Sequence, residues 1–134
     1  MKIIITGGAG YIGSHVVLAA LDRGYEVTIF DDLSNSNKSH VNPEANFHIG
    51  STKSKKDLEN LFESNCYEGV IHLAANKDVG ESMENPRKYL KNNIVGSLNL
   101  LNKCIKHKIE YFIFSSSAAV YGNPQYNPID ELHP

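Results

Sequence analysis

The chain has 134 residues, of which 41% are hydrophobic, an ordinary share for a protein that folds around one core. Its 13 Lys and Arg side chains stand against 15 Asp and Glu, so the net charge of −2 provides no basic field for a nucleic acid or an anionic membrane. The apolar run at residues 3–5 is too short for a signal sequence, and no later segment approaches the length of a membrane span.

Two cysteines, Cys66 and Cys104, lack the paired spacing of a zinc site. We therefore expect no metal centre, and free thiols in the reducing cytoplasm.

The chain begins with a strand, a glycine turn and a helix. Residues 2–6 are rich in β-branched side chains and do not alternate, which is typical of a parallel strand buried on both faces. Gly24 is placed to end the helix that follows the glycines, and the apolar residues at helical spacing are Ile12, Val16, Ala19 and Ala20. A second strand over residues 26–30 runs into Asp31 and Asp32, and residues 33–43 have loop chemistry.

Three further strands alternate with helices. We predict strands at residues 46–49, 69–73 and 111–114. The helix after the first of these has a core stripe of Leu58, Leu61 and Phe62. Asn85 and Pro86 begin a long helix whose apolar face carries Leu90, Ile94, Leu98, Leu101 and Ile105.

This alternation predicts an α/β fold, a Rossmann-like parallel sheet with helices on both faces and ligands at the carboxyl ends of the strands. Residues 123–134 carry three prolines and are typical of an extended loop. A doubly wound domain usually has a sixth strand, so we expect residues 1–134 to form one incomplete dinucleotide-binding domain that stops after about the fifth strand.

The glycine turn at residues 7–13 fits two registers. One uses Gly8, Gly10 and Gly13, and the other replaces Gly8 with Gly7. Either one lets a pyrophosphate approach backbone N–H groups at a helix N-terminus without obstruction by a Cβ. The turn follows a strand, opens a helix and is trailed by a carboxylate, so it predicts dinucleotide binding over a plain connecting turn.

The acidic pair Asp31 and Asp32 stands where a carboxylate accepts hydrogen bonds from both ribose hydroxyls of an adenosine. A 2′-phosphate would meet like charge there, which predicts NAD as the cofactor. Asp31 is the favoured ligand because it follows the strand directly. The alternative is a solvated loop start.

Several ordered blocks identify a family. The chain resembles the N-terminal part of the extended short-chain dehydrogenase/reductases, and within them the nucleotide-sugar 4-epimerases. The resemblance rests on residues 6–15, 31–36, 70–75, 79–82, 92–93 and 114–122.

The resemblance implies a set of site residues. Ser117 would be the catalytic serine, and hydride would pass from C4 of a UDP-sugar to NAD and back to the opposite face. The residues expected to bind the cofactor are Gly7, Gly10, Tyr11, Ile12, Gly13, Asp31, Asp32, Leu33, Ser34, Asn35, Ser36, Ser51, Thr52, Leu73, Ala74, Ala75, Lys77 and Asn92.

Three departures from the family pattern matter. Ala118 and Ala119 replace the acid and base of 4,6-dehydratases, which favours an epimerase. Ser51 replaces an Asp near the adenine and hydrogen-bonds more weakly than a carboxylate. No tyrosine is followed four residues later by lysine, so the family's Tyr-x-x-x-Lys pair is missing. We expect that pair and the UDP-sugar domain to lie beyond Pro134, and the isolated chain to be inactive.

Two alternatives stay open. The chain could belong to another extended-family nucleotide-sugar epimerase or reductase, or act as a non-catalytic NAD-sensing module. Because the long helix would be partly uncovered, we also expect a homo-oligomer. His72, in a buried strand, is interpreted as a core histidine whose ring nitrogens are satisfied.

Overall fold

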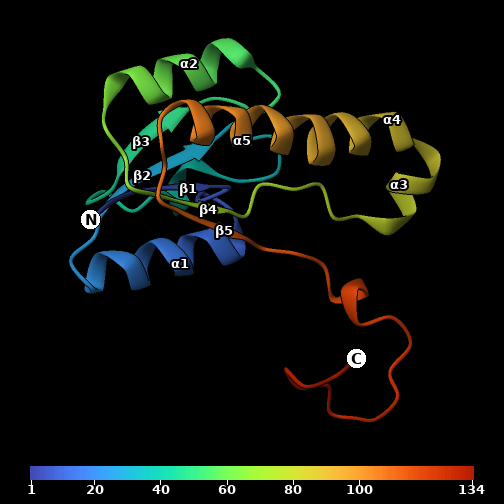
Figure 1. Ribbon diagram of the computed structural model, residues 1–134. Helices are drawn as coiled ribbons and strands as arrows, with labels where there is room; N and C mark the ends of the chain where they lie inside the picture. The colour runs from blue at the N-terminus through green and yellow to red at the C-terminus, as the bar shows by residue number, and fades with distance from the viewer.

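A computed structural model describes residues 1–134 and contains one sheet of five parallel strands (Figure 1). The sheet has the order β3-β2-β1-β4-β5. The chain builds outward from β1 to β3 on one side and then crosses to β4, so the order reverses between β1 and β4. Ligands of open α/β sheets bind at such a reversal. The strands are β1 (Lys2–Thr6), β2 (Glu26–Asp31), β3 (Asn46–Ile49), β4 (Gly69–His72) and β5 (Tyr111–Phe114).

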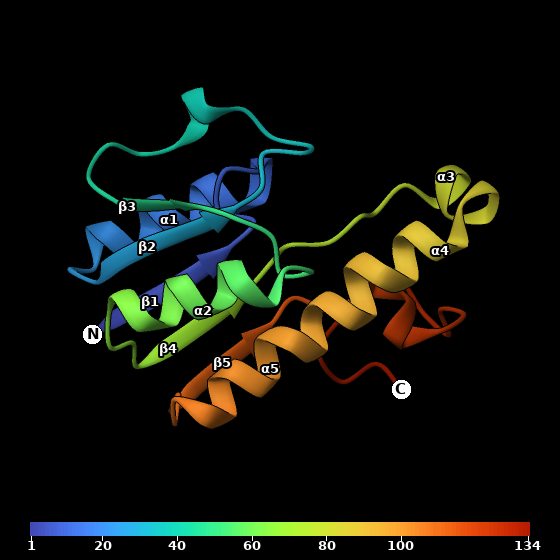
Figure 2. The same cartoon turned by 90° about the horizontal axis from the view of Figure 1, so that it is seen from above.

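Burial on both faces explains the unbroken apolar run of β1. Ile4 joins the core on one face, whereas Ile3 and Ile5 join the core on the other. The first core includes Leu58, Leu61 and Phe62, the predicted stripe of α2 (Lys55–Ser64). Figures 1 and 2 show α2 and α5 over one face of the sheet and α1 over the other. The predicted fold class is therefore confirmed.

The helix α1 (Tyr11–Asp22) ends as expected but faces the sheet differently. Gly24 has a φ of +77° just beyond the helix. Its buried residues are Gly13, Val17 and Ala20, whereas Ile12 is 59% exposed. Of the predicted stripe, Ala20 is buried, Val16 packs against the core and Ala19 is half-buried, so only Ile12 was wrong. The close contact of Gly13 with the glycine turn puts Gly13 in place of Ile12 against the fold.

The long helix contains a wider turn that the sequence pattern did not reveal. Residues 86–106 comprise α4 (Pro86–Tyr89), a π-helical turn η2 (Leu90–Val95) and α5 (Gly96–Lys106). Asn85 begins the helix, although its side chain makes no capping hydrogen bond. The buried residues of α5 are Gly96, Leu100 and Cys104. The five apolar residues predicted on one face are exposed.

The remaining segments are short. Helix α3 (Val79–Glu84), which the sequence analysis missed, is capped by the Asp78 side chain. Two 3₁₀ turns, η1 (Lys38–His40) and η3 (Ala118–Tyr121), interrupt loops. As expected, residues 123–134 form no helix or strand, and Figure 1 shows them running away from the sheet. None of the helices has the length and apolar character needed to cross a membrane.

Candidate functional site

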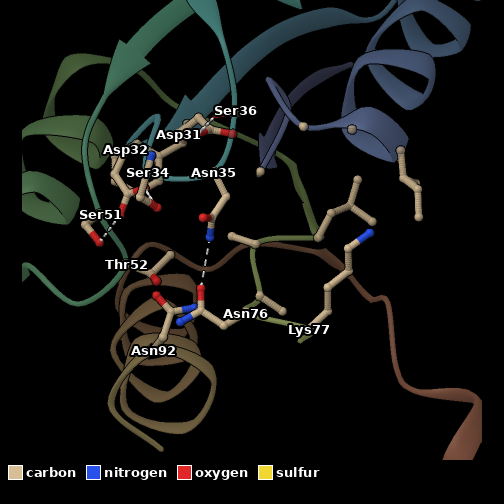
Figure 3. A pocket seen from close by; sticks show the side chains of 18 of the residues that line it. Asp31, Asp32, Ser34, Asn35, Ser36, Ser51, Thr52, Asn76, Lys77 and Asn92 are labelled. Atoms are coloured by element: carbon tan, nitrogen blue, oxygen red, sulfur yellow. Dashed lines mark hydrogen bonds between the residues drawn. The ribbon is translucent and has the colours of Figure 1, made fainter. Parts of the chain in front are cut away.

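A cavity of about 490 Å³ lies at the carboxyl ends of the strands (Figure 3). Most of the residues predicted to bind a cofactor line it. They are Gly7, Gly10, Tyr11, Ile12, Gly13, Asp31, Asp32, Ser34, Asn35, Ser36, Ser51, Thr52, Leu73, Ala74, Ala75, Lys77 and Asn92. Asn76, within the range 73–77 that the resemblance assigns to the middle of the cofactor, also lines it. The sequence analysis missed six other lining residues, namely Phe30, Gly50, Asp78, Glu81, Tyr89 and Ser115.

Two predicted site residues do not line the cavity. Leu33 has a φ of +56°, and its backbone N–H donates to Asp31 Oδ1 over 2.9 Å, so it shapes the loop after β2. Ser117 is exposed, and its Oγ accepts a hydrogen bond from the N–H of Ala119. Ser115, two residues earlier, reaches the cavity instead.

The glycine turn is built from backbone contacts that exclude side chains. Gly7 has a φ of +72°, and a Cβ on it would lie 2.9 Å from the backbone nitrogen of Ala74. Gly7 and not Gly8 lines the cavity, so the register Gly7, Gly10, Gly13 describes the turn. The turn opens α1, whose first N–H groups carry the positive end of the helix dipole. This edge of the cavity can hold an anionic group.

Asp31 at the end of β2 is tied into the fold. Asp31 is buried, with only 9% of the residue exposed. Oδ2 accepts from the Ala9 N–H over 3.1 Å, and Oδ1 accepts from the Leu33 N–H and the Ser36 hydroxyl over 2.9 and 2.8 Å. Asp31 thereby links the glycine turn to the loop after β2. An oxygen with one partner retains capacity for a further donor from a ligand.

Asp32 is more open than its neighbour. Burial by itself raises the pKa of Asp32, but hydrogen bonds from Ser34 and Ser51 and the charge of Lys53 hold that pKa below its ordinary value. Asp32 therefore stays ionised at neutral pH and contributes a fixed negative charge to this end of the cavity.

The loop after β4 is held by side chains. Its N–H groups at Leu73 and Ala74 donate to Thr6 Oγ1 over 3.2 and 3.3 Å. The side-chain amide of Asn93, in the π-helical turn, accepts from the Asn76 N–H over 2.9 Å and donates to the Asn76 carbonyl over 2.8 Å. The Leu73 N–H is shared with the Thr6 carbonyl over 3.1 Å. The N–H groups of Ala74 and Asn76 have side-chain partners instead of ladder partners, so these contacts fix the shape of the loop.

His72 connects Thr6 and Asn93, the two residues whose side chains hold that loop. The Ser97 hydroxyl donates to the Asn93 carbonyl over 2.6 Å, so the contact of Ser97 Oγ with His72 Nε2 over 2.8 Å requires a proton on Nε2. His72 Nδ1 then accepts from the Thr6 hydroxyl over 2.6 Å. Burial lowers the pKa of His72 to about 4, so the ring is neutral. The expectation of a satisfied core histidine is confirmed.

Asn93→Ala is expected to lower the free energy of unfolding by about 2 kcal/mol, because it leaves the N–H and carbonyl of Asn76 without partners. Urea denaturation measures the change. Asn102→Ala is the matched control, because Asn102 is exposed on the same long helix and makes no side-chain hydrogen bond. Equal stability of the two variants would show that Asn93 does not hold the loop.

The two sides of the cavity also contact each other. The side-chain amide of Asn35 donates to Asn76 Oδ1 over 3.3 Å, and Figure 3 shows this contact between the loops that follow β2 and β4. The same figure places Asp32 and Ser51 toward one end and Lys77 toward the other. The chemistry of the lining therefore changes along the cavity. Carboxylates and hydroxyls line one end, the backbone N–H groups of the glycine turn line the middle, and a lysine lies at the other end.

Comparison with known proteins places the chain among enzymes. The sequence pattern of the NAD dependent epimerase/dehydratase family matches residues 3–134. A UDP-glucose 4-epimerase from Dictyostelium discoideum is 45% identical over 99% of this chain and 41% of its own length. A bifunctional UDP-glucose 4-epimerase and UDP-xylose 4-epimerase from Pisum sativum is 43% identical over 97% of this chain and 40% of its own length.

Solved structures give the same result. The UDP-glucose 4-epimerase of Thermus thermophilus in complex with NAD has a TM-score of 0.92 at 34% identity, covering 100% of this chain and 44% of the solved one. The enzyme of Thermotoga maritima with UDP-glucose has a TM-score of 0.90 at 41% identity, covering 99% and 44%. The chain spans about 40% of the length of the curated relatives it matches. By its sequence and its fold, the chain belongs to the NAD dependent epimerase/dehydratase family.

Proposed function

We propose that residues 1–134 form the NAD-binding domain of a nucleotide-sugar 4-epimerase that interconverts UDP-glucose and UDP-galactose. One observation carries the proposal: a glycine turn at a helix N-terminus and a carboxylate at the end of the neighbouring strand line the same cavity. These are the two groups that a pyrophosphate and an adenosine ribose require. Relatives whose names or complexes include UDP-glucose 4-epimerase and NAD support the choice of reaction and cofactor.

Each group along the cavity has a task in this proposal. Asp31 accepts from the ribose hydroxyls of the adenosine, and the N–H groups at the start of α1 hold the pyrophosphate. Thr6 and Asn93 keep the loop at residues 73–76 in the shape that faces the middle of the cofactor. When bound there, NAD would supply the hydride acceptor and donor for C4 of the sugar, and these residues would hold and orient it. Ser117 is proposed as the catalytic serine.

The proposal separates binding from turnover. General base catalysis at the sugar hydroxyl requires a group tuned to take its proton. The family's Tyr-x-x-x-Lys pair does not occur in these 134 residues. Tyr89, the only tyrosine besides Tyr11 that lines the cavity, donates to Glu81, and burial followed by that contact raises the pKa of Tyr89 to about 12. Tyr89 is therefore unsuited to act as the base.

The 134-residue chain is expected to bind NADH with one saturable site and to show no epimerisation of UDP-galactose. Fluorescence titration measures the binding, and a coupled assay for UDP-glucose measures turnover. Asp31→Ala is expected to weaken NADH binding at least about tenfold, because hydrogen bonds to a charged group contribute about 1.5–3 kcal/mol.

Glu84→Ala serves as the control for Asp31→Ala, because Glu84 is exposed and does not line the cavity. Circular dichroism checks that each variant is folded. Robust turnover by the wild-type chain would overturn the proposed separation of binding from catalysis, and equal affinity of the two variants would overturn the role of Asp31.

We also propose that the chain self-associates in the cytoplasm. The exposed apolar side chains of the long helix favour burial against a partner, here a second copy. They are Leu90, Ile94, Leu98, Leu101 and Ile105. Cys66 and Cys104 are both free, as in a reducing compartment.

A further inference from the structure

A second hollow adjoins the cavity beside Ser51. It has a volume of about 380 Å³, and its lining carries three lysines and no carboxylate. The lining residues are Ser51, Lys53, Ser54, Lys88 and Lys91. Ser51 also lines the cavity, so it forms a wall that the two spaces share. Three lysine side chains therefore border one small volume in a chain whose net charge is −2.

The three lysines come from different elements that tertiary contacts hold together. Lys53 follows β3, Lys88 lies in α4 and Lys91 lies in the π-helical turn η2. The side-chain amide of Asn99, in α5, donates to the Thr52 carbonyl over 3.2 Å and so holds the loop after β3 against the long helix. The fold, and not a basic run in one segment, brings these lysines to the same hollow.

Helix α2 begins at the edge of this hollow. Ser54 is its N-cap residue, and Ser54 Oγ accepts from the Asp57 N–H over 3.2 Å. The N–H groups of residues 55 and 56 have no acceptor within the helix, and they carry the positive end of the dipole of a ten-residue helix. Side chains and backbone therefore both give the hollow positive charge, which suits an anion.

Two of the lysines are shared with carboxylates of the cavity. Lys53 Nζ lies 3.6 Å from Asp32 Oδ2, and Lys88 Nζ pairs with Glu81 Oε1. Asp32 and Glu81 line the cavity but not the hollow. Lys91 makes no ion pair. An anion in the hollow therefore meets one unpaired ammonium and competes for two that neutralise the wall of the cavity.

We propose that the hollow binds inorganic diphosphate and that its occupancy weakens dinucleotide binding in the cavity. One phosphate group carries between one and two negative charges at neutral pH, so a diphosphate can pair with several ammonium groups at once. No hydrophobic residue lines the hollow, so it has no surface on which the base of a nucleotide could stack. This lining favours the inorganic anion over a nucleoside diphosphate.

The coupling between the two spaces follows from charge. Bound diphosphate draws Lys53 and Lys88 into the hollow, which leaves Asp32 and Glu81 less neutralised. The pyrophosphate of NADH is itself negative, so NADH binds less tightly beside a more negative wall. By linkage, NADH weakens diphosphate binding by the same factor. This half of the inference rests on the proposed binding of NAD.

Calorimetric titration with sodium pyrophosphate, in the absence of divalent metal, tests the anion site. The 134-residue chain is saturated with NADH, so that the glycine turn is occupied. Wild type is expected to bind one diphosphate, and Lys91→Gln to bind it at least about tenfold more weakly, because a charge-assisted contact is lost. Lys108→Gln removes the same charge from an exposed site just beyond the end of α5 and outside the hollow. This control is expected to match wild type.

Fluorescence titration with NADH at increasing pyrophosphate concentration tests the coupling, with ionic strength held constant by sodium chloride. The apparent Kd for NADH is expected to rise about fivefold and then to level off, because both ligands can be bound together. Lys91→Gln is expected to keep the wild-type affinity for NADH without pyrophosphate and to show little rise with it. Direct competition at the glycine turn would instead raise the Kd without limit.

The outcomes separate the two proposals. The inference is overturned if the NADH-saturated chain binds no diphosphate, if Lys91→Gln binds it as tightly as wild type, or if Lys108→Gln is weakened equally. It is also overturned if the Kd for NADH rises without limit, or if UDP binds more tightly than pyrophosphate and loses that binding in Lys91→Gln. If the chain does not bind NADH, the proposed function is wrong and the coupling falls with it, whereas diphosphate binding that depends on Lys91 would still support the anion site.

Discussion

Replacing Gly13 with alanine is expected to lower the free energy of unfolding by about 3 kcal/mol and to abolish measurable NAD binding. A Cβ at this position would lie 2.0 Å from the Gly7 carbonyl oxygen and 2.7 Å from Gly8 Cα. Both are backbone atoms of the glycine turn, and the Gly7 N–H is bonded to the Phe30 carbonyl over 2.9 Å. The turn cannot yield without losing its contact with β2.

The effect on binding follows from the same displacement. Moving Gly7 away from α1 separates the N–H groups that the pyrophosphate needs, because they are positioned by the turn. Urea denaturation gives the stability of Gly13→Ala, and calorimetric titration with NAD gives the affinity.

Gly80→Ala is the control for Gly13→Ala. Its new Cβ would lie 3.4 Å from the nearest atom, Asp78 Oδ1, an ordinary contact, and Gly80 lies in helix α3. Alanine at Gly80 is expected to leave stability unchanged or to raise it by up to about 1 kcal/mol. A Gly13→Ala chain as stable as Gly80→Ala, with wild-type affinity for NAD, would contradict the role given to the turn.

Acid is expected to destabilise the fold through His72. The folded pKa of His72 is about 4 because of burial, against 6.5 as the ordinary value. Between these two values the unfolded chain binds a proton that the folded chain does not, so the free energy of unfolding falls as pH falls from 6.5 to 4. The loss attributable to this one ring is about 3 kcal/mol.

The structural consequence reaches the site. A second proton would go to Nδ1, which accepts from the Thr6 hydroxyl, and Thr6 Oγ1 is the acceptor for the N–H groups of Leu73 and Ala74. Protonation therefore disturbs the loop that faces the middle of the cofactor. Urea denaturation at a series of pH values between 4 and 8 measures the effect.

His72→Gln isolates the contribution of the ring. The variant is expected to be less stable at pH 7, because it cannot reproduce both contacts of the ring, but its stability should depend less on pH. Parallel curves for the wild type and His72→Gln between pH 6.5 and 4 would show that another group causes the acid sensitivity.

Local sequence signals predicted the sheet and the glycine turn well. The strand at residues 2–6 needed only its unbroken run of β-branched residues, and Gly24 marked the end of α1 through a backbone conformation that glycine favours. The turn could be predicted because it requires residues without a Cβ. Such requirements act on consecutive residues, so they are visible in the sequence itself.

Contacts between distant segments were not predictable in the same way. Asn93 was noticed only as part of a family block, yet its amide fixes the backbone of Asn76 from another element. The π-helical turn that brings Asn93 there leaves no mark in the spacing of apolar residues. The only signal was the pair of asparagines at positions 92 and 93 inside a helix, because asparagine has a low propensity for helix interiors.

The serines and aspartates predicted for the site differ in where the structure places them. Ser117 was assigned from a resemblance, and its side chain caps a short 3₁₀ turn outside the cavity. Asp31 was favoured over Asp32 as the ribose ligand only because it follows the strand directly. Their difference depends on donors that come from the glycine turn and from the loop after β3.

A crystal structure of the 134-residue chain grown with saturating NAD tests the central claim most directly. We predict one NAD in the cavity, with the adenosine ribose on Asp31 and the pyrophosphate at the N–H groups of residues 10–13. The loop at residues 73–76 should keep its contacts with Thr6 and Asn93. An empty cavity under these conditions, or a cofactor bound in the reverse direction or on another surface, would contradict the account.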